Sequence, residues 1–356
     1  MSSSLTPPAA LPASTLSPIN QRRLNVFKSN KRAYYSFWIF LILFFTSIFS
    51  EFIANDKPLI ASYKGEWYFP VLMIYPEIQF GGDFETEADY LDPYVTELIE
   101  TEGWMLWPLI PYSFDTHIKN LKHPAPSPPT LKNFLGTDDQ ARDVTARVIY
   151  GFRISILFAL TLTFGSTALG LFAGAIQGYY GGKIDLLGQR FLEIWGSLPV
   201  LFLLIILASI TKANFWWLLG IMLLFSWTSL VDVVRAEFLR CRKLDFVRAA
   251  QALGISDAVI MWRHILPNAI VATITMMPFL LTGAIATLTS LDFLGFGLPP
   301  GSASLGELVS QGKNNLQAPW LAFTAFFVLS LMLTLLVFIG EGVRDALDPR
   351  LNKGGH

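Results

Sequence analysis

Residues 321–340 read LAFTAFFVLSLMLTLLVFIG, twenty residues without a single charged side chain. A helix needs roughly 20 apolar residues to cross the hydrocarbon core of a membrane, so this stretch alone predicts a transmembrane helix. Five more segments are also free of charged residues and of similar length: 33–50, 154–178, 194–211, 213–231 and 268–291. A soluble protein can bury one such helix, but six together predict an all-α integral membrane protein with six transmembrane helices.

The composition supports the same class. Of the 356 residues, 53% are hydrophobic and 15% are charged, and the mean hydropathy is +0.47, which is too apolar for an ordinary soluble domain. The single cysteine, Cys241, excludes a disulfide within the chain and a thiol metal site. The motifs of zinc proteases, serine hydrolases and phosphate-binding loops are absent. We therefore expect no catalytic residue, no metal, no cofactor and no nucleic-acid partner.

Basic residues flank the apolar segments unevenly and predict how the chain crosses the membrane. They gather before the first segment, between the second and third, between the fourth and fifth, and after the sixth, whereas the short loops on the other side carry only Lys212 and Lys313. By the positive-inside rule, both termini are cytoplasmic. The long stretch between the first two helices then forms a large extracytoplasmic insert.

These features predict five consecutive regions and one prominent loop. They are a cytoplasmic leader with a basic flank at 1–32, a first transmembrane helix at 33–51, a periplasmic domain at 52–150, a five-helix core at 151–340 that contains a cytoplasmic loop at 236–267, and a cytoplasmic tail at 341–356.

The cytoplasmic loop has the pattern of a docking segment. Residues 245–253 are good helix formers, and Gly254 follows them as a C-terminal stop. Pro267 marks the start of the fifth transmembrane helix. We expect a short helix lying across the membrane surface, in which the small side chains of Ala249 and Ala250 let it enter a groove on a partner. A rigid-body push on this helix would be transmitted to the fourth and fifth transmembrane helices.

Three glycines mark the second transmembrane segment. Gly170, Gly174 and Gly178 recur at every fourth position, which puts a smooth ridge on one helix face where another backbone can approach closely. The ridge indicates tight packing inside one subunit, which we favour, or a gating helix at a subunit interface.

Two prolines and a group of hydroxyl side chains mark other segments. Pro199 in the third segment and Pro278 in the fifth are expected to bend their helices. The fifth segment is also rich in hydroxyls, among them Thr282, which could bond to other helices or line a translocation pathway.

The 248–267 stretch resembles the coupling loop of ABC-importer permeases, whose pattern is E-A-A-x3-G-x9-I-x-L-P. Two positions depart from it: an arginine replaces the acidic residue, as is usual in the peptide-importer branch, and a histidine stands at the isoleucine position. The resemblance implies an ATPase-coupling loop formed by Arg248, Ala249, Ala250, Leu253, Gly254, His264, Leu266 and Pro267.

Other segments are similar to the peptide branch of the same family, and the similarity covers residues 20–351. They include LGTDD at 135–139, GYYGG at 178–182, LDFLGFG at 291–297 and RDALDP at 344–349. The resemblance implies a multi-pass permease of the bacterial inner membrane that takes up peptides or peptide-like compounds, including peptide-nucleotide antibiotics of the microcin C type. The implied partners are a second homologous permease, two ATPase subunits that bind the ATP, a periplasmic peptide-binding protein, the lipid bilayer and the peptide substrate.

Two questions stay open: the role of the periplasmic domain and the function of the chain. The periplasmic domain either caps the pathway and contacts the binding protein, or only braces the two permeases. The rival function is an ion-coupled secondary peptide carrier that acts without an ATPase. Such a carrier would need a deeply placed ionisable group and internal repeats, and neither is evident in the sequence. A membrane-embedded hydrolase is a more distant alternative, because no nucleophile and base are paired.

Overall fold

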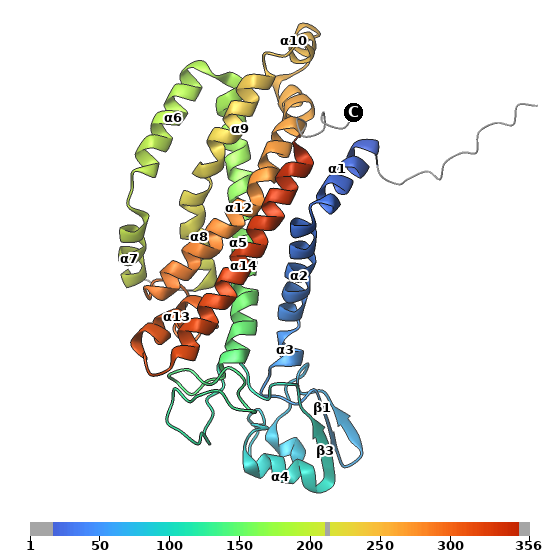
Figure 1. Cartoon of the computed structure of the whole chain (residues 1–356), viewed down its shortest axis with the longest axis vertical. Helices are drawn as coiled ribbons and strands as arrows, with labels where there is room; N and C mark the ends of the chain where they lie inside the picture. Colours follow the sequence, from blue (N-terminus) through green and yellow to red (C-terminus); the bar gives the residue numbers. More distant parts are fainter. Residues whose placement is uncertain (1–16, 211–213, 349–356) are drawn as a thin grey trace, which may run out of the picture.

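The computed structural model describes residues 17–210 and 214–348. Its long helices run side by side as an elongated bundle, with a helical loop at one end and a small sheet-containing domain at the other (Figure 1). Helices α1 (Pro18–Ser29) and α2 (Lys31–Ile48) lie beside α14 (Pro319–Leu347), so the first and last described helices pack together along one side of the bundle.

Four helical stretches among the described residues are long and apolar enough to cross a membrane, or five if one bent pair counts as a single span. The expected number of six is therefore not confirmed by length and composition. The four are α5 (Val144–Tyr180), α8 (Phe215–Ser226) with α9 (Thr228–Cys241), the run of α11 (Asp257–Val259), η2 (Ile260–Ile265) and α12 (Leu266–Phe293), and α14; the bent pair is α6 (Gly182–Gly196) with α7 (Val200–Ile210).

The first and third expected helices differ from the prediction for separate reasons. Segment 33–50 becomes α2, whose apolar part covers about 24 Å at 1.5 Å per residue, less than the roughly 30 Å of a hydrocarbon core. The chain then breaks at Phe49 before α3 (Ser50–Ile53). Segment 194–211 is not one helix, because Pro199 separates α6 from α7, which are bent by 62°. The bend at Pro199 was expected, since its ring excludes a regular preceding turn.

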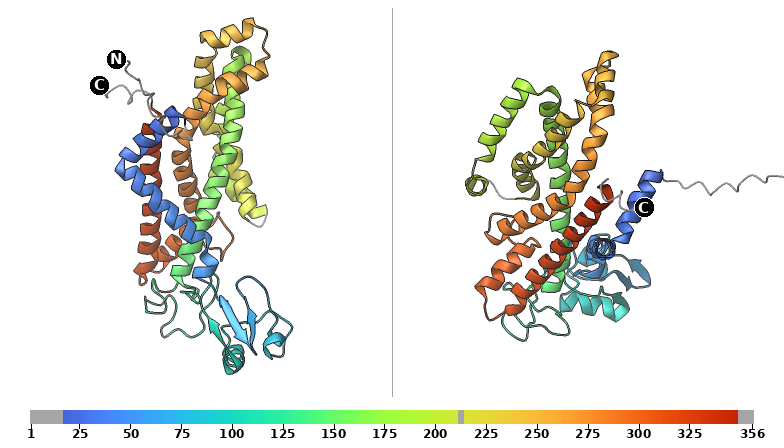
Figure 2. Two further views of the ribbon diagram at one scale, coloured as in Figure 1. Left: turned by 90° about the vertical axis from the view of Figure 1, so that its right-hand side faces the viewer. Right: turned by 45° about the horizontal axis from the view of Figure 1, so that its top comes forward.

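The fifth helix begins earlier than predicted. Its helical run starts at Asp257, so Pro267 lies inside the run and not at its start. The π-helical stretch η2 ends just before this proline, and its wider turn gives room where the ring would clash with the carbonyl four residues earlier. Further along, Pro278 lies within α12, and Figure 2 shows this helix changing direction along its length.

Other helices also extend beyond their predicted boundaries. α9 continues to Cys241, which shortens the loop expected at 236–267, and α14 continues to Leu347, past the expected start of the tail at 341. α5 begins at Val144, before the expected core boundary at 151, because Asp143 caps it by accepting a hydrogen bond from the Ala146 amide at 2.9 Å. Helical hydrogen bonding thus continues beyond the apolar segments.

The expectation of an all-α fold is wrong for the segment between α3 and α5. This segment, which we call the sheet domain over residues 54–111, contains a three-stranded antiparallel sheet. The strand order is β2 (Glu66–Tyr68), β1 (Ile60–Tyr63), β3 (Gly103–Leu106). Lys64 and Gly65 connect β1 to β2, and both have positive φ angles of 52° and 85°, as a two-residue hairpin turn requires.

The sheet domain has a core of its own. One face of the sheet packs with η1 (Glu77–Phe80) and α4 (Pro93–Glu102) around the buried side chains of Phe80, Tyr90 and Ile99. Aromatic rings contact edge to face throughout this core, for example Phe80 against Tyr68 at 5.1 Å. The strands are only three or four residues long, too short for their alternation to be recognised in the sequence.

Candidate functional site

The loop around α10 (Asp245–Ala252) forms the tip of the bundle opposite the sheet domain (Figure 1). The helix expected over 245–253 is present, and it is amphipathic. Val247 and Ala250 are buried against the ends of the bundle helices, whereas Arg248 and Ala249 are exposed. The tip therefore presents one face of a short helix to whatever lies beyond it.

Gly254 ends α10 in the manner expected from the sequence. Its φ of +75° lies in the left-handed region, and its amide donates to the carbonyl of Gln251 at 3.0 Å. The next amide, of Ile255, donates to the carbonyl of Ala250 at 3.1 Å. These two bonds form a Schellman motif, which requires the left-handed residue. Nothing lies within 4 Å of a Cβ added at Gly254, so the backbone angle and not space selects glycine.

Large apolar side chains project from this tip. Leu253 is 81% exposed, Trp262 is 76% exposed and Phe246 is 46% exposed. Among the remaining predicted loop residues, Pro267 is also exposed, whereas His264 and Leu266 are partly buried. The structure thus brings the predicted residues to one end of the molecule, and it adds Phe246 and Trp262, which the motif did not include.

The α10 loop is tied to the end of α5. The Tyr179 hydroxyl donates to Asp257 Oδ1 at 2.5 Å and accepts from Gln251 Nε2 at 3.4 Å, and the Tyr179 carbonyl accepts from Arg242 Nη1 at 3.0 Å. Arg235 of α9 pairs with Asp185 of α6 through a 2.8 Å contact from Nη2 to Oδ2. A displacement of α10 is therefore coupled to α5 directly. Sequence reasoning quoted Tyr179 within a motif but assigned it no role.

The glycine ridge of α5 packs against α9 of the same chain. A Cβ at Gly174 would lie 2.8 Å from the Val231 carbonyl oxygen, and one at Gly178 would lie 2.6 Å from that of Arg235. Gly170 meets the Trp227 carbonyl oxygen in the same way at 2.9 Å. The observed contact is packing inside one subunit, so this face of α5 is not free for a second subunit.

The hydroxyl groups of α12 bond within their own helix. Thr282 Oγ1 donates to the Pro278 carbonyl at 2.9 Å. This is the carbonyl four residues earlier, which in an α-helix also accepts from the Thr282 amide. Thr273, Thr287 and Ser290 donate in the same way to the carbonyl four residues earlier. These donors therefore do not bond across helices.

A buried ionic cluster joins the start of α5 to α13 (Leu305–Asn314), at the end that carries the sheet domain. Arg142 Nε donates to Asp138 Oδ2 at 2.7 Å, and Arg147 Nη2 donates to Glu307 Oε2 at 2.9 Å. Arg142 also pairs with Glu307 at 3.1 Å, and Arg147 pairs with Asp138 at 3.4 Å. The side chains of Arg142, Arg147 and Asp138 are at most 1% exposed.

Sequence reasoning missed this cluster as a unit. The segment LGTDD was noted only as a family motif, and Glu307 lies 160 residues from Arg147 in the chain. The available signal was the alternation of acidic and basic residues in 138–147 next to an apolar segment. Charged side chains that are buried with satisfied partners hold elements in one arrangement, since separating them leaves an uncompensated charge.

The long apolar helices define a polytopic membrane protein, with an exposed amphipathic tip at one end. Residues 166–353 match the family of binding-protein-dependent transport system inner membrane components. The chain is 58% identical to the inner membrane ABC transporter permease protein YejE of Escherichia coli K12, over 94% of this chain and 98% of that protein. The chain therefore belongs to this family and is a multi-pass protein of the bacterial inner membrane.

Two further relatives extend the comparison. The peptidoglycan transport system permease protein YejE of Agrobacterium fabrum is 58% identical over 94% of both chains. The oligopeptide transport system permease protein OppC of Haemophilus influenzae is 35% identical over 67% of this chain and 77% of that protein. The family match begins at residue 166 and so excludes the sheet domain, whereas the YejE proteins resemble the chain along nearly its whole length.

Proposed function

We propose that this chain is the transmembrane subunit of an ATP-driven ABC importer and forms half of its translocation pathway. It has no catalytic site of its own, and ATP is bound by two partner ATPase subunits. In this proposal the chain crosses the membrane six times, with α2 as the first span and the α6–α7 pair as the third. Both termini and the α10 loop are cytoplasmic, and the sheet domain is periplasmic.

The exposed tip around α10 carries this proposal. The tip combines a short helix, whose Gln251 bonds to Tyr179 of α5, with the exposed Leu253 and Trp262 side chains that follow it, and a partner protein covers this surface. Movement of the ATPase subunits on ATP binding would push α10 and, through Asp257, the helix that continues into α12. Reorientation of α5, α9 and α12 would then alternate the pathway between outward-open and inward-open states.

The α6–α7 pair supports a second, homologous permease as a partner. The pair lies at one side of the bundle, where α6 packs against α5 and Leu204 of α7 is buried (Figures 1 and 2). It also exposes large apolar side chains on both helices: Leu186, Leu187, Phe191, Ile194, Phe202 and Ile206. A helix pair exposed on several faces is better explained by contact with another subunit than by lipid alone.

The substrates proposed are peptides and peptide-like compounds. The relatives at 58% and 35% identity are named for the transport of peptidoglycan and of oligopeptides. We include peptide-nucleotide antibiotics of the microcin C type among the candidate substrates. A periplasmic peptide-binding protein would deliver the substrate to the end of the bundle that carries the sheet domain.

The experiment that tests the proposal is purification of the tagged chain from its native membrane, followed by identification of the bound proteins and an ATPase assay. We expect ATPase subunits and a second permease to co-purify. Leu253→Asp should remove the ATPase subunits, because it puts a charge into an apolar contact without touching the rest of this chain. Leu316→Asp is the matched control, since Leu316 is 83% exposed and lies near α13, at the opposite end of the bundle.

If the chain purifies without any ATPase, or if both variants keep it equally, the proposed coupling through α10 is wrong. An ATP-independent uptake that follows an ion gradient would then favour the secondary carrier.

A further inference from the structure

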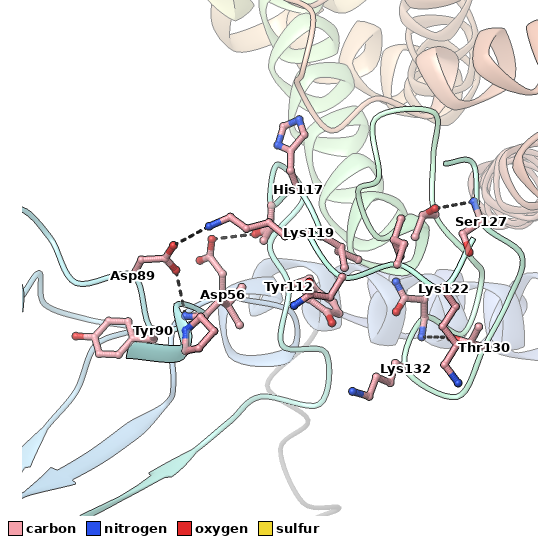
Figure 3. A pocket seen from close by; sticks show the side chains of 18 of the residues that line it. Asp56, Asp89, Tyr90, Tyr112, His117, Lys119, Lys122, Ser127, Thr130 and Lys132 are labelled. Carbon is pink, nitrogen blue, oxygen red and sulfur yellow. Dashed lines mark hydrogen bonds and ion pairs between the residues drawn. The ribbon is translucent and has the colours of Figure 1, made fainter. Parts of the chain in front are cut away.

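A cavity of about 860 Å³ lies between the sheet domain and the 112–137 loop, away from the α10 tip (Figure 3). Its volume falls in the range of about 300–1,000 Å³ that is typical of small-molecule sites. In the proposed topology this cavity opens to the periplasm. None of the features assigned above, the α10 loop, the glycine ridge or the buried ionic cluster, uses it.

On one side of this cavity most charged residues are already paired: Lys57 pairs with Glu87, and Lys119 pairs with Asp89 at 3.6 Å. On the same side, Asp56 has no ammonium group within 4.0 Å among the described residues, and its Oδ2 accepts from Thr116 Oγ1 at 2.9 Å. Lys122 and Lys132 lie on the other side of the cavity (Figure 3). Among the described residues, no carboxylate lies within 4.0 Å of the ammonium group of Lys122 or Lys132. The side with Lys122 and Lys132 can therefore accept an anion, and the side with Asp56 can accept a cation.

A buried amide donor on the basic side also lacks a partner. Asn133 lines the cavity and is 6% exposed, yet no described residue accepts a hydrogen bond from its Nδ2. Its backbone is fixed in a turn, because its amide donates to Thr130 Oγ1 at 3.1 Å and its carbonyl accepts from the Thr130 amide at 2.9 Å. Since the Nδ2 atom itself is buried, it is not counted among the groups that a ligand in the cavity contacts.

On the opposite side, the Asp56 carboxyl favours a cation as its partner. Partial burial raises the pKa of the Asp56 carboxyl above its usual value, against the lowering effect of the Thr116 hydrogen bond. An ammonium group placed beside Asp56 would restore the stability of the charged carboxylate. The described residues contain no group of three metal-ligating side chains, which does not favour a metal ion as the occupant.

We propose that this cavity binds a short peptide with free termini, its carboxylate at Lys122 and Lys132 and its ammonium group at Asp56. The site would hold the substrate on the permease itself, outside the membrane. This inference rests on the proposed function, since it takes peptides as the transported compounds. A zwitterion provides a partner for the Asp56 carboxylate on one side and for the Lys122 and Lys132 ammonium groups on the other, whereas a peptide with one blocked terminus leaves one side without a partner.

The test uses the complete importer in lipid nanodiscs, without the binding protein, and a tripeptide that carries benzophenone on its central residue and has free termini. After illumination, mass spectrometry locates the crosslink. We expect it in the residues that line the cavity, and we expect unlabelled tri-alanine to compete about tenfold better than its N-acetylated or C-amidated form. The double variant Lys122→Glu with Lys132→Glu should lose the crosslink, and Lys64→Glu, on the same domain but outside the cavity, should keep it.

Three outcomes would overturn the inference. They are crosslinks confined to the membrane helices, equal competition by the blocked peptides, and a crosslink that persists in the double variant. ATP-driven uptake by the unaltered importer with its binding protein is measured in parallel. Its loss contradicts the proposed function, whereas intact uptake without the cavity crosslink contradicts this inference alone.

Discussion

Arg147 has no exposed surface, and in the described part of the chain its acidic partners are Glu307 and Asp138. Its Nη2 also donates to the Ser302 carbonyl at 2.9 Å and its Nη1 to the Phe114 carbonyl at 3.3 Å. One side chain thus joins the start of α5, the segment before α13 and the 112–137 loop. The position of this end of the bundle depends on a few buried charges, and their removal has predictable consequences.

Arg147→Ala should destabilise the protein by about 3–5 kcal/mol, because it leaves Glu307 and Asp138 without a full set of partners in a buried site. The measurement is the midpoint of thermal unfolding of the purified complex, followed by tryptophan fluorescence. Arg190→Ala is the matched control, since Arg190 and its partner Glu193 are both exposed and such a pair is worth about 0–1 kcal/mol. Equal midpoints for the two variants would contradict the structural role of Arg147.

Asp143 should make stability depend on pH. Burial raises the pKa of this carboxyl to about 6, with a smaller raising effect from Asp138 and an opposing hydrogen bond from the Ala146 amide. The folded state therefore holds the proton more tightly than the unfolded state, and the contribution of Asp143 to stability falls as the pH rises from about 4 to about 6.

Asp143→Asn keeps the acceptor for the Ala146 amide but cannot ionise. We expect it to raise the unfolding midpoint at pH 7.5, by up to about 3 kcal/mol in stability, and to change it little at pH 4.5. Asp92→Asn is the matched control, because Asp92 caps α4 through the Tyr94 amide at 2.9 Å but is partly exposed. A gain that is the same at both pH values would show that the buried charge is not its cause.

At the scale of helices, the ridge on α5 brings two backbones together over about two helical turns. Gly170, Gly174 and Gly178 face carbonyl groups of Trp227 and of α9 at distances where any Cβ would overlap them. Movement of α10 can reach the membrane helices through this contact, because α5 and α9 pack too closely to slide independently.

Gly174→Ala should destabilise the protein by about 1–3 kcal/mol through overpacking, since its Cβ would meet the Val231 oxygen and Val234 at 2.8 Å. Gly220→Ala in α8 is the control, because nothing lies within 4 Å of its added Cβ and alanine is the better helix former by about 0.5–1 kcal/mol. Opposite shifts of the unfolding midpoint are expected, and a neutral Gly174→Ala would argue against close packing of α5 on α9.

Some elements could be predicted from local sequence signals alone. The helix at 245–252, its stop at Gly254 and the break at Pro199 follow from backbone preferences of single residues, and the sequence predicted them. The start of the fifth helix at Asp257 was predicted wrongly. Pro267 normally favours a helix start, but η2 lets the helix pass through it, and this depends on how Ile260 and Ile265 are buried against the bundle.

At the scale of the whole molecule, the sheet domain turns an apolar face outward. Ser62 of β1 pairs with Trp67 on one side and Trp104 on the other, and these two indole rings contact edge to face at 5.6 Å. The adjoining loop exposes Leu72 and Ile74. We propose that this face contacts the periplasmic binding protein, and that it does more than brace the two permeases.

The double variant Trp67→Ser with Ile74→Ser should abolish uptake driven by the binding protein and leave co-purification of the ATPase subunits unchanged. Both side chains are more than 60% exposed, so the buried core around Phe80 remains intact. Ile19→Ser is the control, with equal exposure on α1 at the other end of the molecule. Loss of the complex in the double variant would instead favour the bracing role.

The sequence by itself determined the membrane class, the short helix at 245–252 with its stop, and the family, because each depends on residues close together in the chain: charge-free runs, a helix with its stop, and short motifs. Only the tertiary structure decided that the glycine ridge faces α9, that Arg147 meets Glu307, that three short strands form a sheet, and that Asp56 and Lys132 line one cavity. These features join segments far apart in the chain, and packing selects their partners from many residues with equal local preference.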